Sequence, residues 1–343
     1  MSTATTTMVS ETARKRRIAP VLTLVFLAPF IAEVLSGATR MSAIFALVPE
    51  MMIWGCGALL ARELVRRWGG GWPSLLMFGL ALSIAEEFVV QQTSLAPLPF
   101  PGALANYGRL WGVNWIYFLF MLGYESVWVV LVPVQVTELL FPERRNETWL
   151  RTRGMIISAV LFLLGSWTAW YAWIRRMRPM IFHVPVYTPA LLTIMAGLAA
   201  IVLLGVEAYL LRRIGRVVAG RSAPPAWVVG VAALVLGFPW YWLMELQFSP
   251  QSTHPPFWIP LAVCGAWALL AYALFRRWTS SPAWSDLRRW AGAFATTVVC
   301  MVAGFLGSSS WLRVDVIGKA GLNIAAIAGF LWLLGRIRQR SVV

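Results

Sequence analysis

Charged residues are scarce in this chain. Only 13% of its 343 residues are charged, 59% are hydrophobic, and the mean hydropathy is +0.70. An ordinary soluble domain carries about twice this share of charge, so the composition excludes that class of protein. The sequence therefore predicts an all-α fold, namely a polytopic transmembrane helical bundle.

Cysteine and histidine are equally sparse, and this argues against two kinds of site. Cys56, Cys264 and Cys300 all lie in apolar stretches, without paired spacing and without a neighbouring histidine. A disulfide framework needs cysteines that can pair, and a cysteine or histidine metal site needs ligands at characteristic spacings. We therefore expect three buried thiols that behave as small hydrophobic groups. The sequence implies no particular cofactor and leaves open whether a metal is bound.

Long apolar stretches are abundant. A spanning helix needs roughly 20 mainly apolar residues, and on that criterion we predict about ten spans. These lie at residues 18–38, 43–66, 72–95, 113–140, 152–173, 189–211, 226–247, 257–275, 288–309 and 315–335. We expect a single transmembrane helical domain at 18–335, flanked by basic cytoplasmic tails at 1–17 and 336–343.

The placement of Arg and Lys predicts the orientation. On one side of the predicted spans they lie at 14–17, 62–67, 144–153, 212–221, 276–289 and 336–340. Only the cluster at 175–178 argues against this bias. Cytoplasmic loops carry an excess of basic residues, so both termini are predicted to be cytoplasmic.

The basic charge also indicates partners and location. Although the formal net charge is +15, its clusters flank apolar spans, so we expect anionic lipid headgroups as partners and no nucleic acid. Arginine supplies nearly all of this charge, a bias typical of GC-rich bacterial genomes. The predicted location is the bacterial plasma membrane, as a multi-pass protein.

Four glutamates inside the predicted spans have no opposite charge within one turn of their helix: Glu33, Glu86, Glu87 and Glu125. An ionisable group in mid-membrane costs on the order of 2.5–3.5 kcal/mol, so each is a candidate functional residue. At about 1.5 Å per residue, the first three lie at one level in the outer third of the bilayer. Glu125 lies one or two turns deeper. Glu245, near the outer end of its span, is expected either to roof the same cavity or to reach water.

Helical spacing predicts which polar groups face these acids. One polar stripe on the third span consists of Ser83, Glu87, Gln91 and Ser94. Asn114 and Glu125 are eleven residues apart, about three turns, and should share a face of the fourth span. We therefore expect Gln91 and Asn114 to support the acidic site.

Two other acids have a simpler interpretation. Glu63 and Asp315 each precede a basic residue by four positions, Arg67 and Lys319 respectively. Opposite charges at this spacing stabilise a helix, so we interpret both as structural ion pairs.

The adjacent glutamates resemble a known motif. In the CAAX-protease and bacteriocin-processing (CPBP) family of intramembrane glutamic proteases the first motif reads Glu-Glu-x-x-x-Arg, and here 86–91 reads Glu-Glu-x-x-x-Gln. A divergent bacterial branch of membrane proteins is similar through 28–40, 57–87 and 132–150. The resemblance is best in 28–150, and the second half is similar only in its hydropathy.

Departures from the family pattern concern the basic and amide groups. Gln91 replaces the arginine of the first motif, and the second motif, Phe-x-x-x-His, has its counterpart at Met121-x-x-x-Glu125. No later helix carries a His-x-x-x-Asn motif. The two histidines, His183 and His254, lie in predicted outer loops.

The resemblance implies an intramembrane endopeptidase in which Glu86 and Glu87 activate a water molecule for attack on a peptide carbonyl. Glu33, Gln91, Asn114, Glu125 and Glu245 would then support the site or contact the substrate. That substrate would be a membrane-embedded peptide or a lipid-modified one.

Two alternatives arise from the acids themselves. Clustered carboxylates without histidine or arginine suit protons or a hard cation better than an oxyanion, which favours a protein that binds or transports cations or protons. In a catalytically inactive scaffold, the acids would only accept hydrogen bonds.

Overall fold

The computed structural model describes residues 18–100, 103, 104, 106–213, 218, 220–306, 308 and 311–340. The predicted tail at 1–17 lies outside these residues. Helices make up nearly all the regular structure of the described chain, as predicted. Its strands are the short antiparallel pair β1 (Arg109–Leu110) and β2 (Val113–Asn114).

Eight of the described helices are long and apolar enough to cross a membrane. They are Met41–Arg67, Trp72–Val90, Trp115–Leu140, Thr152–Ile181, Leu191–Arg213, Ala226–Phe248, Trp258–Thr279 and Arg313–Arg340. Each coincides with a predicted span. Two predicted spans are not among these eight. The helix Ile18–Val34, within the predicted span 18–38, is shorter than the eight. The helix Asp286–Ala303, which overlaps the predicted span 288–309, has three charged residues in its first turn, Asp286, Arg288 and Arg289. The structure therefore confirms a helical bundle in which eight helices suit a membrane, and it does not confirm ten crossings.

Several long helices are composites. The α-helical parts are α2 (Leu47–Glu50), α3 (Cys56–Arg67), α4 (Trp72–Ile84), α5 (Trp115–Tyr124), α6 (Val132–Leu140), α7 (Thr152–Trp170), α8 (Leu191–Leu210), α9 (Ala226–Gly237), α10 (Trp242–Phe248), α11 (Trp258–Thr279), α12 (Asp286–Ala303) and α13 (Arg313–Arg340). Wider π-helical turns interrupt these helices at η3 (Met51–Gly55) and η5 (Glu125–Leu131), and end them at η1 (Phe30–Val34), η4 (Ala85–Val90) and η7 (Tyr171–Ile181).

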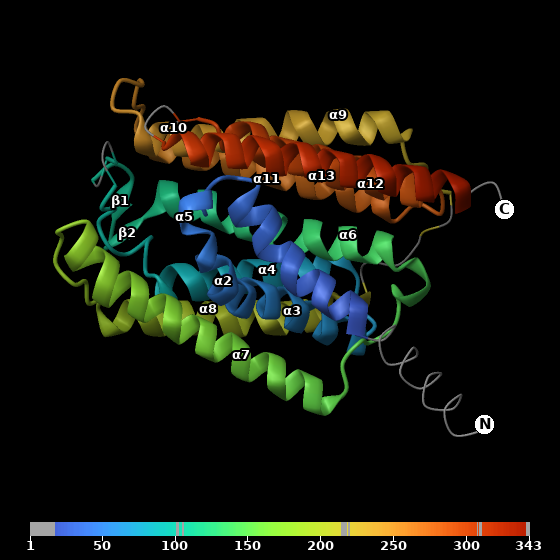
Figure 1. Ribbon diagram of the computed structural model, residues 1–343, viewed down its shortest axis with the longest axis horizontal. Helices are drawn as coiled ribbons and strands as arrows, with labels where there is room; N and C mark the ends of the chain where they lie inside the picture. Colours follow the sequence, from blue (N-terminus) through green and yellow to red (C-terminus); the bar gives the residue numbers. More distant parts are fainter. Residues whose placement is uncertain are drawn as a thin grey trace.

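The helices lie side by side along the long axis of the molecule (Figure 1). The helices through α4 and through α5 and α6 are central, with 67% and 61% of their most apolar stretches buried, against 11% for those of α7, α8 and α11. Large apolar side chains such as Leu163, Leu203 and Leu269 project from the peripheral helices. In a bilayer this exposed apolar surface would contact lipid.

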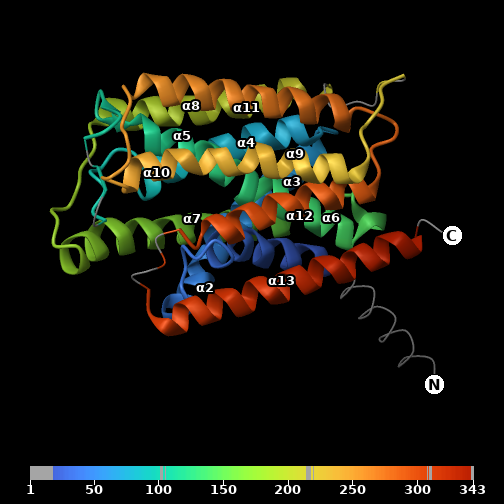
Figure 2. The ribbon, with the colours of Figure 1, turned by 90° about the horizontal axis from the view of Figure 1, so that it is seen from above.

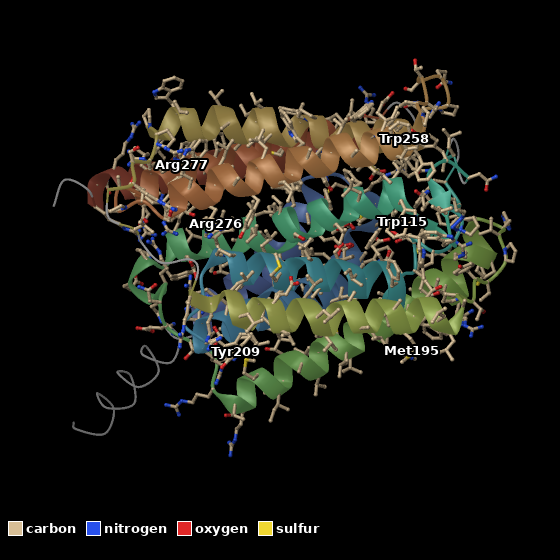
Figure 3. All side chains as sticks on the ribbon, turned by 180° about the vertical axis from the view of Figure 1, so that it is seen from behind. Trp115, Met195, Tyr209, Trp258, Arg276 and Arg277 are labelled. Carbon is tan, nitrogen blue, oxygen red and sulfur yellow. The ribbon has the colours of Figure 1, made fainter. Side chains whose placement is uncertain are left out.

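The start of the first described helix and the end of α13 lie at the same end of the bundle (Figures 1 and 2). Figure 3 shows Arg276 and Arg277 at one end of α11 and Trp258 at the other. Two chain ends on the same side agree with an even number of membrane crossings. That this side is the cytoplasmic one stays a prediction.

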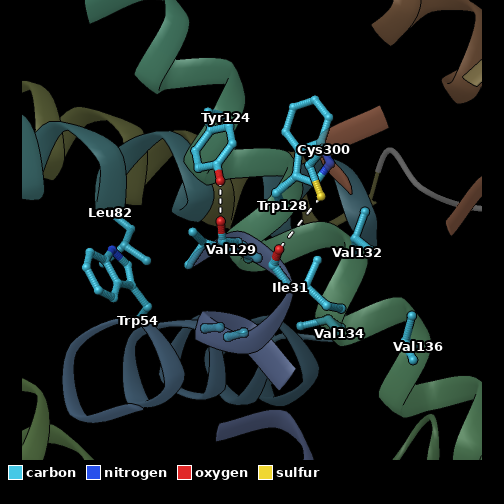
Figure 4. Packing of buried hydrophobic residues seen from close by; sticks show 14 of the residues in the cluster. Ile31, Trp54, Leu82, Tyr124, Trp128, Val129, Val132, Val134, Val136 and Cys300 are labelled. Atoms are coloured by element: carbon cyan, nitrogen blue, oxygen red, sulfur yellow. Dashed lines mark hydrogen bonds between the residues drawn. The ribbon is translucent and has the colours of Figure 1, made fainter. Parts of the chain in front are cut away.

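The apolar core joins residues from helices far apart in the sequence (Figure 4). The Tyr124 hydroxyl donates to the carbonyl oxygen of Ala32, and the Cys300 Sγ lies 3.7 Å from the carbonyl oxygen of Ile31. All three cysteines are free and buried, as predicted.

A buried ionic cluster anchors the loop after α6 to α3. Arg62 Nη1 lies 2.7 Å from Glu63 Oε1, and Arg62 Nε lies 3.3 Å from Glu138 Oε1. The Arg62 guanidinium also stacks 3.4 Å from the ring centroid of Trp149. The predicted pair of Glu63 with Arg67 is therefore wrong: Glu63 binds its direct neighbour, while Arg67 donates to the Leu150 carbonyl at 2.7 Å.

The predicted pair of Asp315 with Lys319 is also wrong. Asp315 Oδ1 accepts from the Ser42 backbone N–H at 2.8 Å. Lys319 donates to the carbonyl oxygens of Leu35 and Met301. Both charged groups are used at contacts between helices, which helical spacing alone does not predict.

Candidate functional site

The glutamates of the candidate site share an unusual backbone setting. Glu33 lies in η1, Glu86 and Glu87 lie in η4, and Glu125 begins η5. Glu50 directly precedes η3. π-Helical turns inside α-helices are frequently found at functional sites. Five acidic side chains on four separate helices thus coincide with wide turns.

The structure brings together the four glutamates singled out by sequence. Glu125 interacts electrostatically with Glu86, Glu87 and Glu33, and Glu86 interacts with Glu87 and Glu33. Glu86, Glu87 and Glu125 are 2%, 1% and 1% exposed, whereas Glu33 is half-buried. We call these four residues the carboxyl cluster.

Hydrogen bonding distinguishes the two adjacent glutamates. Glu87 Oε2 accepts from the hydroxyls of Ser94 at 2.6 Å and Thr93 at 2.7 Å. In the described chain, neither carboxyl oxygen of Glu86 has a hydrogen-bond partner, and the same holds for Glu125. One acid of the pair is held in place, while the other is unbonded.

The surroundings of the carboxyl cluster supply hydroxyls but no positive charge. The Ser83 hydroxyl faces the Glu125 carboxyl group, and Tyr117 lies within electrostatic reach of Glu87 and Glu125. Among the described residues, none of the ion pairs involves a member of the cluster. The site is therefore a set of neighbouring acids without a counter-ion.

Three of the predicted supporting residues lie outside the cluster. The helix ends at Val90, so Gln91 leaves the predicted polar stripe, and in the described chain its side chain makes no hydrogen bond to a glutamate of the cluster. Asn114 caps α5 by accepting from the Tyr117 backbone N–H at 3.0 Å. It also donates to Gln247 Oε1 at 2.9 Å. In the described chain, neither side-chain amide hydrogen-bonds a glutamate of the carboxyl cluster.

Glu245 also stays away from the cluster. It is exposed, and its carboxylate accepts from the Ser252 hydroxyl at 2.8 Å. Of the two expectations for this residue, only contact with water holds. His183 is exposed, and His254 lies 3.1 Å from the Leu246 carbonyl oxygen, so neither supplies the histidine that the CPBP pattern requires.

Sequence reasoning overlooked Glu50. This residue is 7% exposed and accepts a hydrogen bond from the Thr39 hydroxyl, and it interacts electrostatically with Glu33. A signal was present, because Glu50 is a carboxylate inside the predicted span 43–66. The criterion applied to Glu33 selects it equally well.

The described residues were also compared with the arrangements that hold metal ions. Among the described residues, no group of three or more His, Cys, Asp or Glu side chains is arranged to hold a metal ion. The four glutamates of the carboxyl cluster nevertheless approach one another closely enough to interact electrostatically.

Comparisons of this chain with protein-family models, with curated proteins and with solved structures find no match. The resemblance to the CPBP family thus depends on the motif residues alone, and the function must be argued from the site.

Proposed function

We propose that this chain is a multi-pass protein of the bacterial plasma membrane whose carboxyl cluster binds protons or a hard cation. The observation that carries the proposal is the pair Glu86 and Glu125, two buried acids without a basic partner, of which Glu86 has no hydrogen bond in the described chain and Glu125 faces only the Ser83 hydroxyl. An unpaired charge buried in this way costs several kcal/mol. The cluster therefore carries fewer negative charges than it has carboxyl groups, unless a cation is bound among them.

The orientation belongs to the same proposal. Both ends of the described chain lie at one end of the bundle, where most of the arginines also lie. By the positive-inside rule this end is cytoplasmic. Its arginines would contact anionic lipid headgroups.

Infrared spectroscopy of the protein in lipid vesicles tests whether the cluster holds protons. We expect absorption from protonated carboxyl groups at neutral pH, and we expect Glu86→Gln and Glu125→Gln each to remove part of it. An amide has nearly the shape of a protonated acid, so both variants should remain folded.

The matched control is Glu245→Gln, the same substitution at an exposed glutamate, which should leave the spectrum unchanged. A spectrum without protonated carboxyl absorption, or one that neither cluster variant alters, would rule out proton retention at this site. Proton or cation flux into the same vesicles then separates binding from transport.

A second candidate function is the CPBP-like intramembrane endopeptidase. The observation in its favour is the asymmetry of the adjacent acids, because Ser94 and Thr93 hold Glu87 while Glu86 is unbonded. Two neighbouring acids in different environments suit separate acid and base roles. However, such a reaction requires donors for the oxyanion, and the Asn114 side-chain amide already donates to Gln247.

Whole-membrane peptide profiles distinguish the two functions. We expect the wild type and the double variant Glu86→Gln/Glu87→Gln to give identical profiles at equal protein levels. Peptides found only with the wild type would instead establish the glutamate pair as catalytic, and would show the membrane-embedded or lipid-modified substrate directly.

A further inference from the structure

Thr39 links the carboxyl cluster to Glu50. Its backbone N–H donates to the Glu33 carbonyl oxygen at 2.9 Å, and its hydroxyl donates to Glu50 Oε1. The Glu33 and Glu50 carboxylates interact electrostatically. Thr39 and Glu50 are 8% and 7% exposed, and in the described chain the second carboxyl oxygen of Glu50 has no partner. The carboxyl groups of Glu33 and Glu50 and the hydroxyl of Thr39 thus follow one another, with a side-chain hydrogen bond between Thr39 and Glu50 and an electrostatic contact between Glu50 and Glu33.

Thr39 also lines a small pocket at the end of the bundle opposite Arg340. The pocket lies between the chain after η1 and the first turns of α13, and its lining includes Arg40, Asp315 and Lys319. Its free space is close to that of about one water molecule. A hydrated metal ion needs more room than this.

The charges around the pocket also oppose a metal cation. Arg40 lies 4.8 Å from the ring centroid of Trp311. Lys319 donates to two backbone carbonyls, so its ammonium group is fixed. The one acid of the lining, Asp315, already accepts from Ser42 at 2.8 Å and 3.1 Å. Fixed positive groups at an entrance repel metal cations, whereas protons pass along hydrogen bonds through hydroxyls, carboxyls and water.

We propose that Thr39 and Glu50 form one end of a proton path that connects the carboxyl cluster to this pocket. The proposal rests on the proposed function of the cluster and narrows its ligand to protons. Glu33 is the step between Glu50 and the buried acids, and the charged groups that face the path at the pocket are Arg40, Asp315 and Lys319.

Exchange of carboxyl protons for deuterons tests this path. The full-length protein in lipid vesicles is transferred from H₂O to D₂O, and the shift of the cluster's protonated carboxyl absorption is followed in time. We expect Glu50→Gln and Thr39→Val to slow this exchange by roughly tenfold, equivalent to about 1.4 kcal/mol in the barrier. Thr39→Ser, which keeps the hydroxyl, should exchange like the wild type.

Thr137→Val is the matched control, because Thr137 is fully buried and its hydroxyl donates only to the Pro133 carbonyl of its own helix. Unchanged exchange in both Thr39→Val and Glu50→Gln, with the cluster absorption still present, would overturn the path and leave the proposed function intact. Absence of the cluster absorption in the wild type would overturn both. If Glu50→Gln fails to fold, the comparison of Thr39→Val with Thr39→Ser decides alone.

Discussion

Replacing Arg62 with alanine is expected to lower the free energy of unfolding by about 3–5 kcal/mol, the usual effect of removing one partner from a buried ion pair. Arg62 is 1% exposed, and it pairs with Glu63 and Glu138. It also donates to the carbonyl oxygens of Glu147 at 2.8 Å and Arg145 at 2.9 Å. The alanine variant leaves these acceptors without their common donor. Denaturant titration in detergent micelles measures the loss.

The control is Arg151→Ala, because Arg151 is an exposed residue at the same end of the bundle. Surface substitutions of this kind usually change stability by no more than about 0.5 kcal/mol. Equal stability of the Arg62 and Arg151 variants would show that the buried ionic cluster around Arg62 does not hold the loop after α6 in place.

Substituting alanine for Gly55 should have the next largest effect, a loss of about 1–3 kcal/mol that is typical of overpacking. A Cβ atom at Gly55 would lie 2.2 Å from the carbonyl oxygen of Val25 and 2.9 Å from its carbonyl carbon. Both are backbone atoms, so the two helices must separate to admit a methyl group. Small residues at such contacts allow transmembrane helices to pack closely.

Gly265→Ala provides the comparison, because no atom lies within 4 Å of the position where its Cβ would stand. Alanine there should stabilise α11 by about 0.5–1 kcal/mol relative to glycine. The contact between Val25 and Gly55 would be disproved by a Gly55→Ala variant as stable as the wild type.

The sequence was sufficient to predict those features that depend on apolar length and on unpaired charge. Eight predicted spans correspond to helices long enough to cross a membrane. The proximity of Glu33, Glu86, Glu87 and Glu125 also followed, because an acid without a partner on its own helix must find its surroundings on another helix. The apolar length of a span and the lack of a charged partner on the same helix can both be read from the sequence, however the neighbouring helices are arranged.

Predictions that depended on regular helical spacing were less successful. Ser94 meets Glu87, but only because the chain turns after Val90, and the same turn removes Gln91 from the stripe. The assumption of 3.6 residues per turn also ignored the wide turns at the glutamates. A π-helical turn inserts an extra residue, so the faces predicted before and after it no longer match.

Partners across the fold were the other source of error. Asn114 caps a helix and binds Gln247, which is more than a hundred residues away in the chain. Glu63 accepts backbone N–H groups from Trp149 and Leu150 as well as pairing with Arg62. Such contacts depend on the packing of distant segments, and a single sequence does not show which segments meet.

The anchored loop also connects mechanically to the far end of the bundle. Arg62 and Glu63 lie in the same helix, Met41–Arg67, that carries Glu50. Twelve residues separate Glu50 from Arg62, about 18 Å along an α-helix. The helix therefore behaves as a rod with the loop fixed to one end and Glu50 near the other. The wide turn at Met51–Gly55 lies between these two points, so its extra backbone width sets how Glu50 is oriented relative to the anchored end of the helix.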